Sequence, residues 1–316
     1  MLTAEATSSG RCCDDATMAQ LSSTSSPATR VRSFSIVAVV YLTAAIAAVF
    51  AGVAFRDRHP LTVALIADVV ATVAIFTASM VLRNSSMYDT YWSVAPPAIA
   101  AWFVVAAETG TDGIRQALVV SGVAVWSIRL TTNWIRDWPG LAHEDWRYAD
   151  MRAKSPLPWP VTSFFGVHLF PTIQVALGCL ALWPALGSSS RSIGPLDVIA
   201  FVLMVGGAVL EYVADEQMRR FRRTKQPGEI MRRGLWSRSR HPNYLGELLF
   251  WIGVFAAGLG ADPSWWWTVV GPVAMIAMFL GASIPMLDQR SIATRPGYDT
   301  VVRDLPALLP FRLRRR

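Results

Sequence analysis

The chain has 316 residues, of which 53% are hydrophobic and only 16% are charged. Soluble domains usually carry about 25% charged residues, so this composition excludes an ordinary soluble domain over most of the chain. The formal net charge is +7, but most of the excess is arginine that lies between long apolar runs. This distribution is typical of membrane topology rather than of a nucleic-acid-binding surface, and we expect no nucleic-acid partner.

Residues 1–33 are rich in Ser, Thr and Ala and have no apolar periodicity, which predicts a disordered tail. The first apolar run after this tail is longer than the apolar core of a signal peptide, so we expect no cleaved leader. The three cysteines and four histidines form no cluster with metal-ligand spacing, and no bound metal is expected.

Eight apolar segments follow the tail, most of them near the ~20 residues that a helix needs to cross a bilayer. Each is predicted to be a helix, because in hydrocarbon every backbone N–H and C=O must pair within its own segment. The segments are residues 34–55, 61–82, 94–107, 114–134, 161–186, 196–214, 245–259 and 265–286. The third and seventh are short. The expected fold is therefore all-α, a polytopic membrane helix bundle of about 7–8 transmembrane helices.

Lysine and arginine predict the orientation of this bundle. The connections 135–160 and 215–244 and the C-terminal tail are rich in arginine, whereas the alternate connections are nearly neutral. An eight-helix path with both termini in the cytoplasm places every arginine-rich segment on one side of the membrane. Arg56 and Arg58 fall on the other side in this scheme and count against it.

Charged residues form a stripe at the end of the sixth segment. Glu211, Asp215, Arg219 and Arg222 are spaced by four, four and three residues, which places them on one helical face. One interpretation is a set of self-neutralising ion pairs along that helix. The other is a polar wall that binds an anionic cofactor, with the arginines on its phosphates.

The start of the seventh segment is a second candidate site. Pro242 suits the first position of a helix, and Asn243 and Glu247 share one face of that helix. Glu247 lies about one turn inside an apolar helix, which makes it a functional-site hypothesis. The alternative is that Glu247 pairs with Arg240 or with the Asn243 amide.

Four motifs resemble one known family. The chain has Gly-Leu-Trp-x-x-x-Arg-His-Pro-Asn-Tyr-x-Gly-Glu at 234–247, Glu-Asp-Trp-Arg-Tyr at 144–148, Ile-Pro-Met-Leu-Asp at 284–288, and Tyr298 followed by Leu-Pro-Phe at 309–311. Together they resemble the steroid 5α-reductase C-terminal domain, and most closely the bacterial membrane proteins of unknown substrate that carry it. The resemblance covers residues 85–316, preceded by N-terminal transmembrane helices at 34–84.

The resemblance implies an NADPH-dependent reductase of a conjugated carbon–carbon double bond in a hydrophobic, lipid or sterol-like substrate, in the bacterial plasma membrane. Glu211 and Asp215 stand where the family has Asn-x-x-x-Asp contacting the nucleotide, so Glu211 departs from that pattern. Asn243 matches the asparagine on the nicotinamide side. The expected cofactor-binding residues are Glu211, Asp215, Arg219, Arg222, Arg240, His241, Asn243, Tyr244 and Glu247.

The expected catalytic residues are Asp89, Trp126 and Tyr91. Steroid reductases hold the substrate oxygen with a Glu and a Tyr from their N-terminal half, and Asp89 and Trp126 fall at the matching positions. Asp89 either donates a hydrogen bond as a neutral acid or only caps a helix. Trp126 cannot give up a proton as a tyrosine can, and Tyr91 is a substitute by proximity. Residues 144–148 line the cofactor entrance or form a surface ion-pair patch.

Two other functions remain open from the sequence. Isoprenylcysteine carboxyl methyltransferases share the Arg-His-Pro-x-Tyr turn at 240–244, so the chain is alternatively a membrane methyltransferase that uses S-adenosylmethionine. A non-enzymatic membrane scaffold is the third possibility, in which the polar residues only pair with one another.

Overall fold

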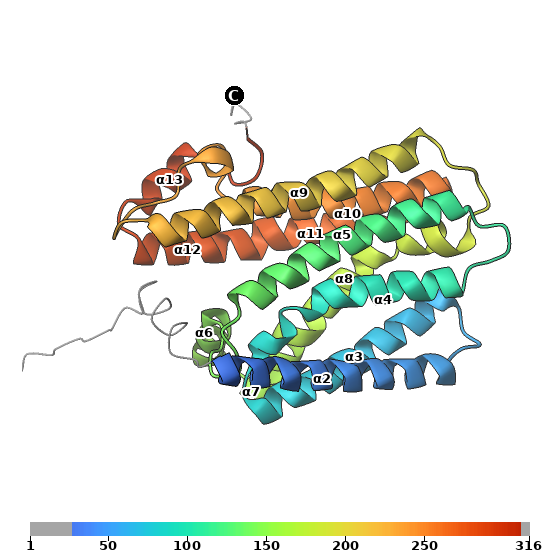
Figure 1. Ribbon diagram of the computed structural model, residues 1–316, viewed down its shortest axis with the longest axis horizontal. Coiled ribbons are helices and arrows are strands. Elements are labelled where there is room, and N and C mark those ends of the chain that lie inside the picture. The colour runs from blue at the N-terminus through green and yellow to red at the C-terminus, as the bar shows by residue number, and fades with distance from the viewer. Residues whose placement is uncertain (1–26, 311–316) are drawn as a thin grey trace, which may run out of the picture.

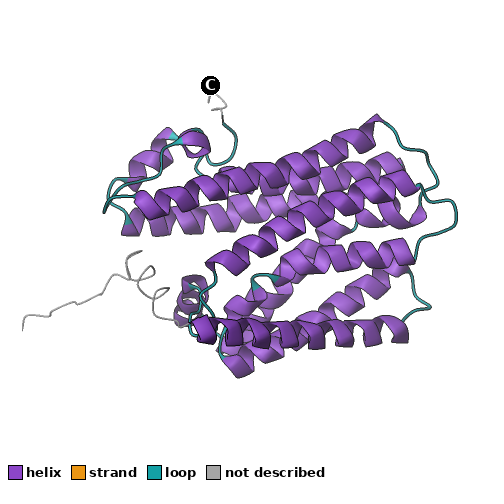
Figure 2. Ribbon diagram, in the orientation of Figure 1, coloured by secondary structure: helices purple, strands orange, loops and turns teal. Residues whose placement is uncertain are grey.

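The computed structural model describes residues 27–310, and that range contains helices and connections but no strand (Figures 1 and 2). Seven of these helices are long and apolar enough to cross a membrane. The all-α prediction and the range of 7–8 transmembrane helices are confirmed. The chain is an integral, multi-pass membrane protein.

The elements are set out here in chain order with the limits that the structure gives them. The first half comprises α2 (Pro27–Ala54), α3 (Pro60–Leu82), η1 (Ser85–Tyr88), α4 (Tyr91–Val105), α5 (Gly113–Asp137), α6 (Trp146–Lys154), α7 (Trp159–Thr162) and η2 (Ser163–Leu169). The second half comprises α8 (Phe170–Cys179), η3 (Pro184–Ser188), α9 (Pro195–Thr224), η4 (Gly234–Ser237), α10 (Pro242–Ala261), η5 (Pro263–Val269), α11 (Val270–Met278), η6 (Phe279–Ser283), α12 (Ile284–Thr294) and α13 (Tyr298–Asp304).

The chain passes along the long axis of the bundle eight times, so that α2 begins and α12 ends at the same end, on the left of Figure 1. The third pass is α4, which has 15 residues and is shorter than a full span. The first helix begins at Pro27 rather than at residue 34, so the last part of the expected tail is helical. Residues 1–26 and the motif residue Phe311 lie outside the described residues.

Two of the passes change to π-helix along their length: the fifth at η2 and η3, and the last at η6. A proline lies in or just after each of these segments: Pro171, Pro184 and Pro285. Proline has no N–H for the helical hydrogen bond and its ring collides with the preceding turn, so the ladder rearranges locally. The first of these segments places His168 in the buried interior.

The two central helices, α9 and α10, approach each other very closely because glycines face the contact. A Cβ on Gly207 would lie 2.5 Å from the Gly246 carbonyl oxygen, and one on Gly246 would lie 2.6 Å from the Gly207 oxygen. Further along, a Cβ on Gly253 would lie 2.8 Å from the Ala200 oxygen. The small residues of the seventh segment therefore serve an internal helix contact.

The main core joins α5, α8, α9 and α10 around large buried side chains. Trp126, Trp251, Phe250 and Met204 are at most 1% exposed. The Trp126 and Phe250 rings stack with centroids 4.3 Å apart. Around this core the α2–α3 hairpin is peripheral, and many apolar side chains of α2 are exposed, as expected of a lipid-facing helix.

Candidate functional site

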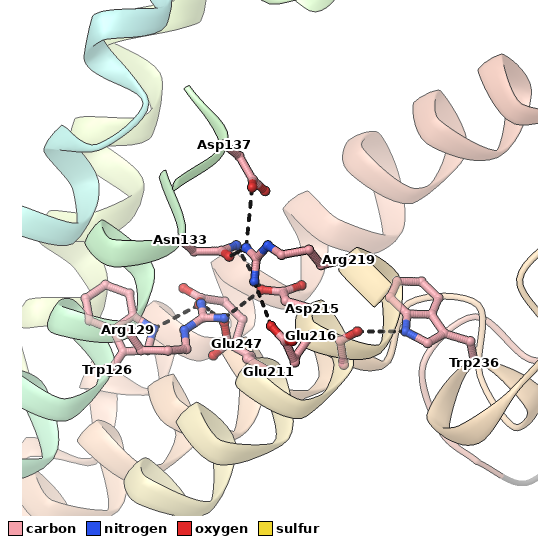
Figure 3. Close-up of polar contacts among 11 residues, drawn as sticks. Trp126, Arg129, Asn133, Asp137, Glu211, Asp215, Glu216, Arg219, Trp236 and Glu247 are labelled. Atoms are coloured by element: carbon pink, nitrogen blue, oxygen red, sulfur yellow. Dashed lines mark hydrogen bonds and ion pairs between the residues drawn. The ribbon is translucent and has the colours of Figure 1, made fainter. Parts of the chain in front are cut away.

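The candidate site is a polar cluster between α5, α9 and α10 (Figure 3). Its centre is Arg129 of α5, which lies between two carboxylates of α9. The Arg129 guanidinium binds Asp215 at 3.0 Å through Nη1, and it binds Glu211 through Nη2. Arg129 and Glu211 are both almost fully buried. The acids of the stripe therefore pair with a neighbouring helix and not with arginines of their own helix.

Asn133 and Arg219 extend the cluster toward the end of the bundle. The Asn133 amide donates to Asp215 at 3.1 Å and accepts a hydrogen bond from the Arg219 guanidinium. Arg219 also forms ion pairs with Glu216 at 3.0 Å and with Asp137 at 3.4 Å. Asn133 and Arg219 thus link α5 to α9, and the predicted stripe on α9 forms one side of a polar cluster whose other side is α5.

Glu247 supplies the third wall, from α10. Its two carboxylate oxygens accept hydrogen bonds of 2.9 Å from the indole N–H groups of Trp126 and Trp251. Glu247 therefore pairs with neither Arg240 nor Asn243. Its carboxyl group is also close enough to Glu211 to interact with it. Because the Trp126 N–H is bound to Glu247, the role of Trp126 in the structure is to hold this carboxylate.

A groove of about 360 Å³ opens beside the cluster, along α5 and α9. Its charged and amide-bearing lining residues are Arg129, Asn133, Arg136, Asp215 and Arg219. Two of the three arginines, Arg129 and Arg219, are already paired with acids of α5 and α9. The exposed Arg136 has no ion pair among the described residues and is the lining cation that remains for an anionic ligand. Arg219 lines this groove as expected, whereas Arg222 is exposed further along α9 and does not line it.

Several buried polar atoms around this cluster have no hydrogen-bond partner among the described residues. They are Arg129 Nε, Arg219 Nε, Glu211 Oε1 and Asn243 Oδ1. Buried polar groups in folded proteins are nearly always hydrogen-bonded, so each such atom requires an explanation. The set combines guanidinium donors with side-chain oxygens that accept.

The remaining residues of the 240–247 motif lie at the junction with the C-terminal segment. Arg240 forms an ion pair with Asp288 at 2.9 Å and donates to the carbonyls of Val302 and Leu305. The His241 ring binds the same Asp288 at 3.2 Å and stacks on Tyr244. The structure therefore separates Arg240 and His241 from the groove and shows them joining α10 to α12.

Asp89 lies at a different point, in the turn between η1 and α4. It accepts a hydrogen bond from the Tyr148 hydroxyl and lies 3.5 Å from the Arg147 guanidinium. The neighbouring Ser85 N–H donates to Glu144 at 2.9 Å. The motif at 144–148 therefore binds the 84–89 turn, which is a more specific role than a surface ion-pair patch.

Burial raises the pKa of Asp89 to about 6, against the opposing effects of Arg147 and of the Tyr148 hydroxyl. At neutral pH most of this carboxyl is consequently ionised, which is also the form that accepts from Tyr148. In this arrangement Asp89 is the hydrogen-bond acceptor, and its role as a neutral donor to a substrate stays a prediction. At Asp145 burial also raises the pKa, but the charge and hydrogen bonds of Arg147, together with the charge of His143, outweigh burial and lower it.

Tyr91 belongs to a polar network inside the N-terminal half. Its hydroxyl donates to Asp68 at 2.6 Å, and Asp68 is only 5% exposed. Nearby, the Tyr88 hydroxyl and Thr172 are 2.7 Å apart, and His168 Nε2 lies 3.1 Å from the Ser79 hydroxyl. The second oxygen of Asp68 has no partner among the described residues.

Sequence reasoning missed Arg129, Asn133 and Asp68 as members of these sites. Each is a polar or charged residue inside an otherwise apolar predicted helix. An ionisable group in that position is a functional-site hypothesis by itself, so Arg129 and Asp68 carried a usable signal. Their partners come from other helices, and only the tertiary structure identifies them.

Comparison with known proteins agrees with the motif resemblance. The model of a family described as "Protein of unknown function (DUF1295)" matches residues 75–304. An uncharacterized protein of Schizosaccharomyces pombe, C594.04c, is 25% identical over 283 residues, which cover 80% of this chain and 82% of the yeast protein. No solved structure matches the chain significantly.

Proposed function

We propose, on the premise that this chain belongs to the DUF1295 family of steroid 5α-reductase-like membrane proteins, that it is an NADPH-dependent reductase. Its substrate would be a hydrophobic lipid or sterol-like molecule with a carbon–carbon double bond conjugated to a carbonyl. The family membership rests on a match over most of the chain, from residue 75 to residue 304. The cofactor, the reaction and the substrate class are our inference from the site.

One observation carries this proposal. The cluster has unpaired guanidinium N–H groups at Arg129 and Arg219 and an unpaired carboxylate oxygen at Glu211. One turn before Glu247 on α10, Asn243 Oδ1 is also unpaired among the described residues. A ligand that complements both kinds of group carries anionic oxygens together with hydroxyl or amide N–H groups. NADPH brings several phosphates together with ribose hydroxyls and a carboxamide. S-adenosylmethionine also has hydroxyls and amines, but its anionic group is a single carboxylate and it has no phosphate. The residues present therefore fit a phosphorylated dinucleotide better than a sulfonium cofactor.

Each wall of the cluster has a distinct role in this proposal. Arg219 and the exposed Arg136 would bind phosphate at the groove, and Arg129 would hold Glu211 and Asp215 in place beneath them. Asn243, at the start of α10, would bind the nicotinamide end. NADPH, when bound, supplies the hydride that reduces the double bond.

Tyr91 is the best candidate to contact the substrate carbonyl. Its hydroxyl now donates to Asp68 in an apolar part of the bundle. In the proposed reaction it would redirect this hydrogen bond from Asp68 to the substrate oxygen. Ser93, two residues after Tyr91, forms hydrogen bonds with Ser127 and Thr131 of α5. These two residues precede and follow Arg129 in α5, so Tyr91 lies at about the same height along the bundle axis as the polar cluster. A donor placed where negative charge develops on an oxygen contributes ~2.7–4 kcal/mol in a dry site.

The proposed location is the bacterial plasma membrane, with both termini in the cytoplasm. The arginine-rich connections 135–160 and 215–244 lie at the end of the bundle where α2 begins and α12 ends. The positive-inside rule assigns that end to the cytoplasm. The groove is at this end, where a soluble dinucleotide can reach it. Arg56 and Arg58 remain at the opposite end.

Ligand binding by detergent-purified protein tests the cofactor. A ligand that binds only the folded state raises the unfolding temperature, so we expect NADPH to stabilise the protein and S-adenosylhomocysteine to have no effect. Arg219→Met should weaken NADPH binding about tenfold, because it removes a charge-assisted contact. Arg220→Met is the matched control, since Arg220 is the adjacent, exposed residue of the same helix.

Other outcomes of this experiment distinguish the alternatives. Stabilisation by S-adenosylhomocysteine and not by NADPH would indicate a methyltransferase. No response to either nucleotide would favour a scaffold. Equal NADPH binding by the Arg219→Met and Arg220→Met variants would remove the groove from the proposal, even if the protein binds NADPH elsewhere.

Turnover tests the role of Tyr91. With an enone lipid that supports NADPH consumption, Tyr91→Phe should lower kcat about 100-fold while NADPH binding stays unchanged, because the hydroxyl acts only on the developing oxyanion. Asp68→Asn should have a smaller effect of the same kind. Normal kcat in Tyr91→Phe would assign the carbonyl contact to another residue.

A further inference from the structure

A second groove lies on the outer surface of the bundle, between α2 and α3. Its lining is mostly apolar, unlike that of the groove beside the polar cluster. Its volume is about 560 Å³, larger than that of the groove on α5 and α9. It is lined by residues 32–40 of α2 and 74–82 of α3, among them Arg32, Ser35, Thr77 and Ala78. Nine residues of α2, from Arg32 to Val40, follow it for roughly 12 Å.

The charge of this groove lies at one end, at Arg32. The hydroxyls of Ser35 and Thr77 donate to carbonyls of their own helices, at 3.1 Å and 2.8 Å, so they offer little to a ligand. The remaining lining between the two helices is apolar. Arg32 alone brings a charge, and it lies where α2 begins and α3 ends.

Arg32 and the nearby Arg30 differ in their hydrogen-bond partners. Arg30 donates to the backbone carbonyls of Ile135, Arg136 and Trp138. Arg32 is exposed and has no hydrogen bond or ion pair among the described residues. Arg83, the residue after the end of α3, is also exposed at this end of the hairpin. In the part of the chain that the structure describes, Arg32 at the end of the groove and Arg83 next to the lining residue Leu82 thus have no acidic partner.

We propose that this groove binds an anionic phospholipid, with an acyl chain between α2 and α3 and the phosphate at Arg32. An open apolar groove that ends in a guanidinium with no partner among residues 27–310 complements one chemical class, an aliphatic chain that ends in an anion. The charge at that end distinguishes this occupant from a second copy of α2, which would bring a further arginine to the same place. The site is independent of the proposed reductase activity.

Lipid binding by the full chain in detergent micelles tests the proposal. We expect phosphatidylglycerol to raise the unfolding temperature at lower concentration than phosphatidylcholine. Arg32→Gln should reduce the preference for phosphatidylglycerol about fivefold, the effect of one juxtamembrane charge. Arg58→Gln is the matched control, because Arg58 is an exposed arginine at the opposite end of the same hairpin.

A second pair of variants tests the groove itself. Ala78→Phe should weaken the binding of both lipids, because the larger side chain fills the groove. Val53→Phe should not, because Val53 lies on the exposed part of α2 outside the groove. Equal stabilisation by both lipids, unchanged by Arg32→Gln, would overturn the proposal. So would a stable dimer in lipid-free detergent that Ala78→Phe abolishes, since a second copy would then occupy the groove.

Discussion

At the scale of single residues, Arg129 determines whether the polar cluster can exist within the bundle. Glu211 is buried, and Asp215 is mostly buried, so both need a counter-charge that water cannot supply. The planar guanidinium of Arg129 donates through two different nitrogen atoms and so contacts both carboxylates at once. A lysine ammonium is a compact charge that cannot offer donors fixed in a plane. Among the described residues the Glu247 carboxylate has no such cation, and two indole N–H groups hold it instead.

Asp89 gives the residue-scale prediction, which concerns pH. Its pKa is raised to about 6 in the folded protein, from 3.8, chiefly by burial. Between those values the unfolded chain loses the proton first, so the free energy of unfolding should fall as pH rises from about 4 to about 6. The decrease should be about 2 kcal/mol. This is less than the full pKa shift implies, because the carboxyl remains 19% exposed and solvent screens its charge.

Denaturation of the wild type and of Asp89→Asn across pH 4 to 7 measures this effect. The variant cannot ionise at position 89, so the difference between the two curves isolates the carboxyl. Parallel curves would mean that the native state does not favour the neutral form of Asp89.

At the scale of helices, the α9–α10 contact positions two walls of the site. Glu211 lies on α9 one turn after Gly207, and Glu247 follows Gly246 on α10. A Cβ on Gly246 would lie 2.5 Å from Cγ of Glu211. The absence of a side chain at this position therefore allows the two carboxyl groups to approach, and the helix contact and the site geometry depend on the same glycines.

Adjacent glycines on α9 provide a matched test of this contact. Gly207→Ala should destabilise the protein by about 1–3 kcal/mol, since its Cβ would lie 2.5 Å from a backbone oxygen. Gly206→Ala meets nothing within 4 Å and should be neutral or stabilising by up to about 1 kcal/mol, because alanine favours helix. Unfolding in detergent compares them, and equal stabilities would contradict close backbone contact at Gly207.

At the scale of the whole molecule, eight passes bring both ends of the described chain to one end of the bundle. The arrangement depends on α4, whose 15 residues are too few for a full span. It is sheltered by neighbouring helices, with Ile99, Ala100 and Phe103 in the main core. A pass that is covered by protein need not match the thickness of the lipid as closely as a lipid-facing helix does.

Site-directed thiol labelling tests the proposed orientation. In a background with Cys12, Cys13 and Cys179 replaced by serine or alanine, Asp57→Cys should react with a membrane-impermeant reagent in intact cells. Gly228→Cys should react only after permeabilisation, since the 215–244 connection is assigned to the cytoplasm. Reaction of Gly228→Cys in intact cells would invert the topology and place the groove outside.

From the sequence alone, the apolar runs determined the helical, membrane-spanning character of the chain and most of its helices. This is a local property, because each helix satisfies its backbone hydrogen bonds within itself. The stripe of Glu211, Asp215 and Arg219 was also recognisable, since a helical period places these residues on one face. The arginine bias led to a hypothesis about orientation by the same kind of local reasoning.

Only the tertiary structure decided the partners. Arg129 of α5 neutralises acids that lie more than eighty residues away on α9, and two tryptophans hold Glu247 where the sequence suggested Arg240 or Asn243. Arg240 and His241 instead bind Asp288, although they belong to the same motif as Glu247. Ion pairs and hydrogen bonds act over a few ångströms, and which groups come within that distance depends on how the helices pack.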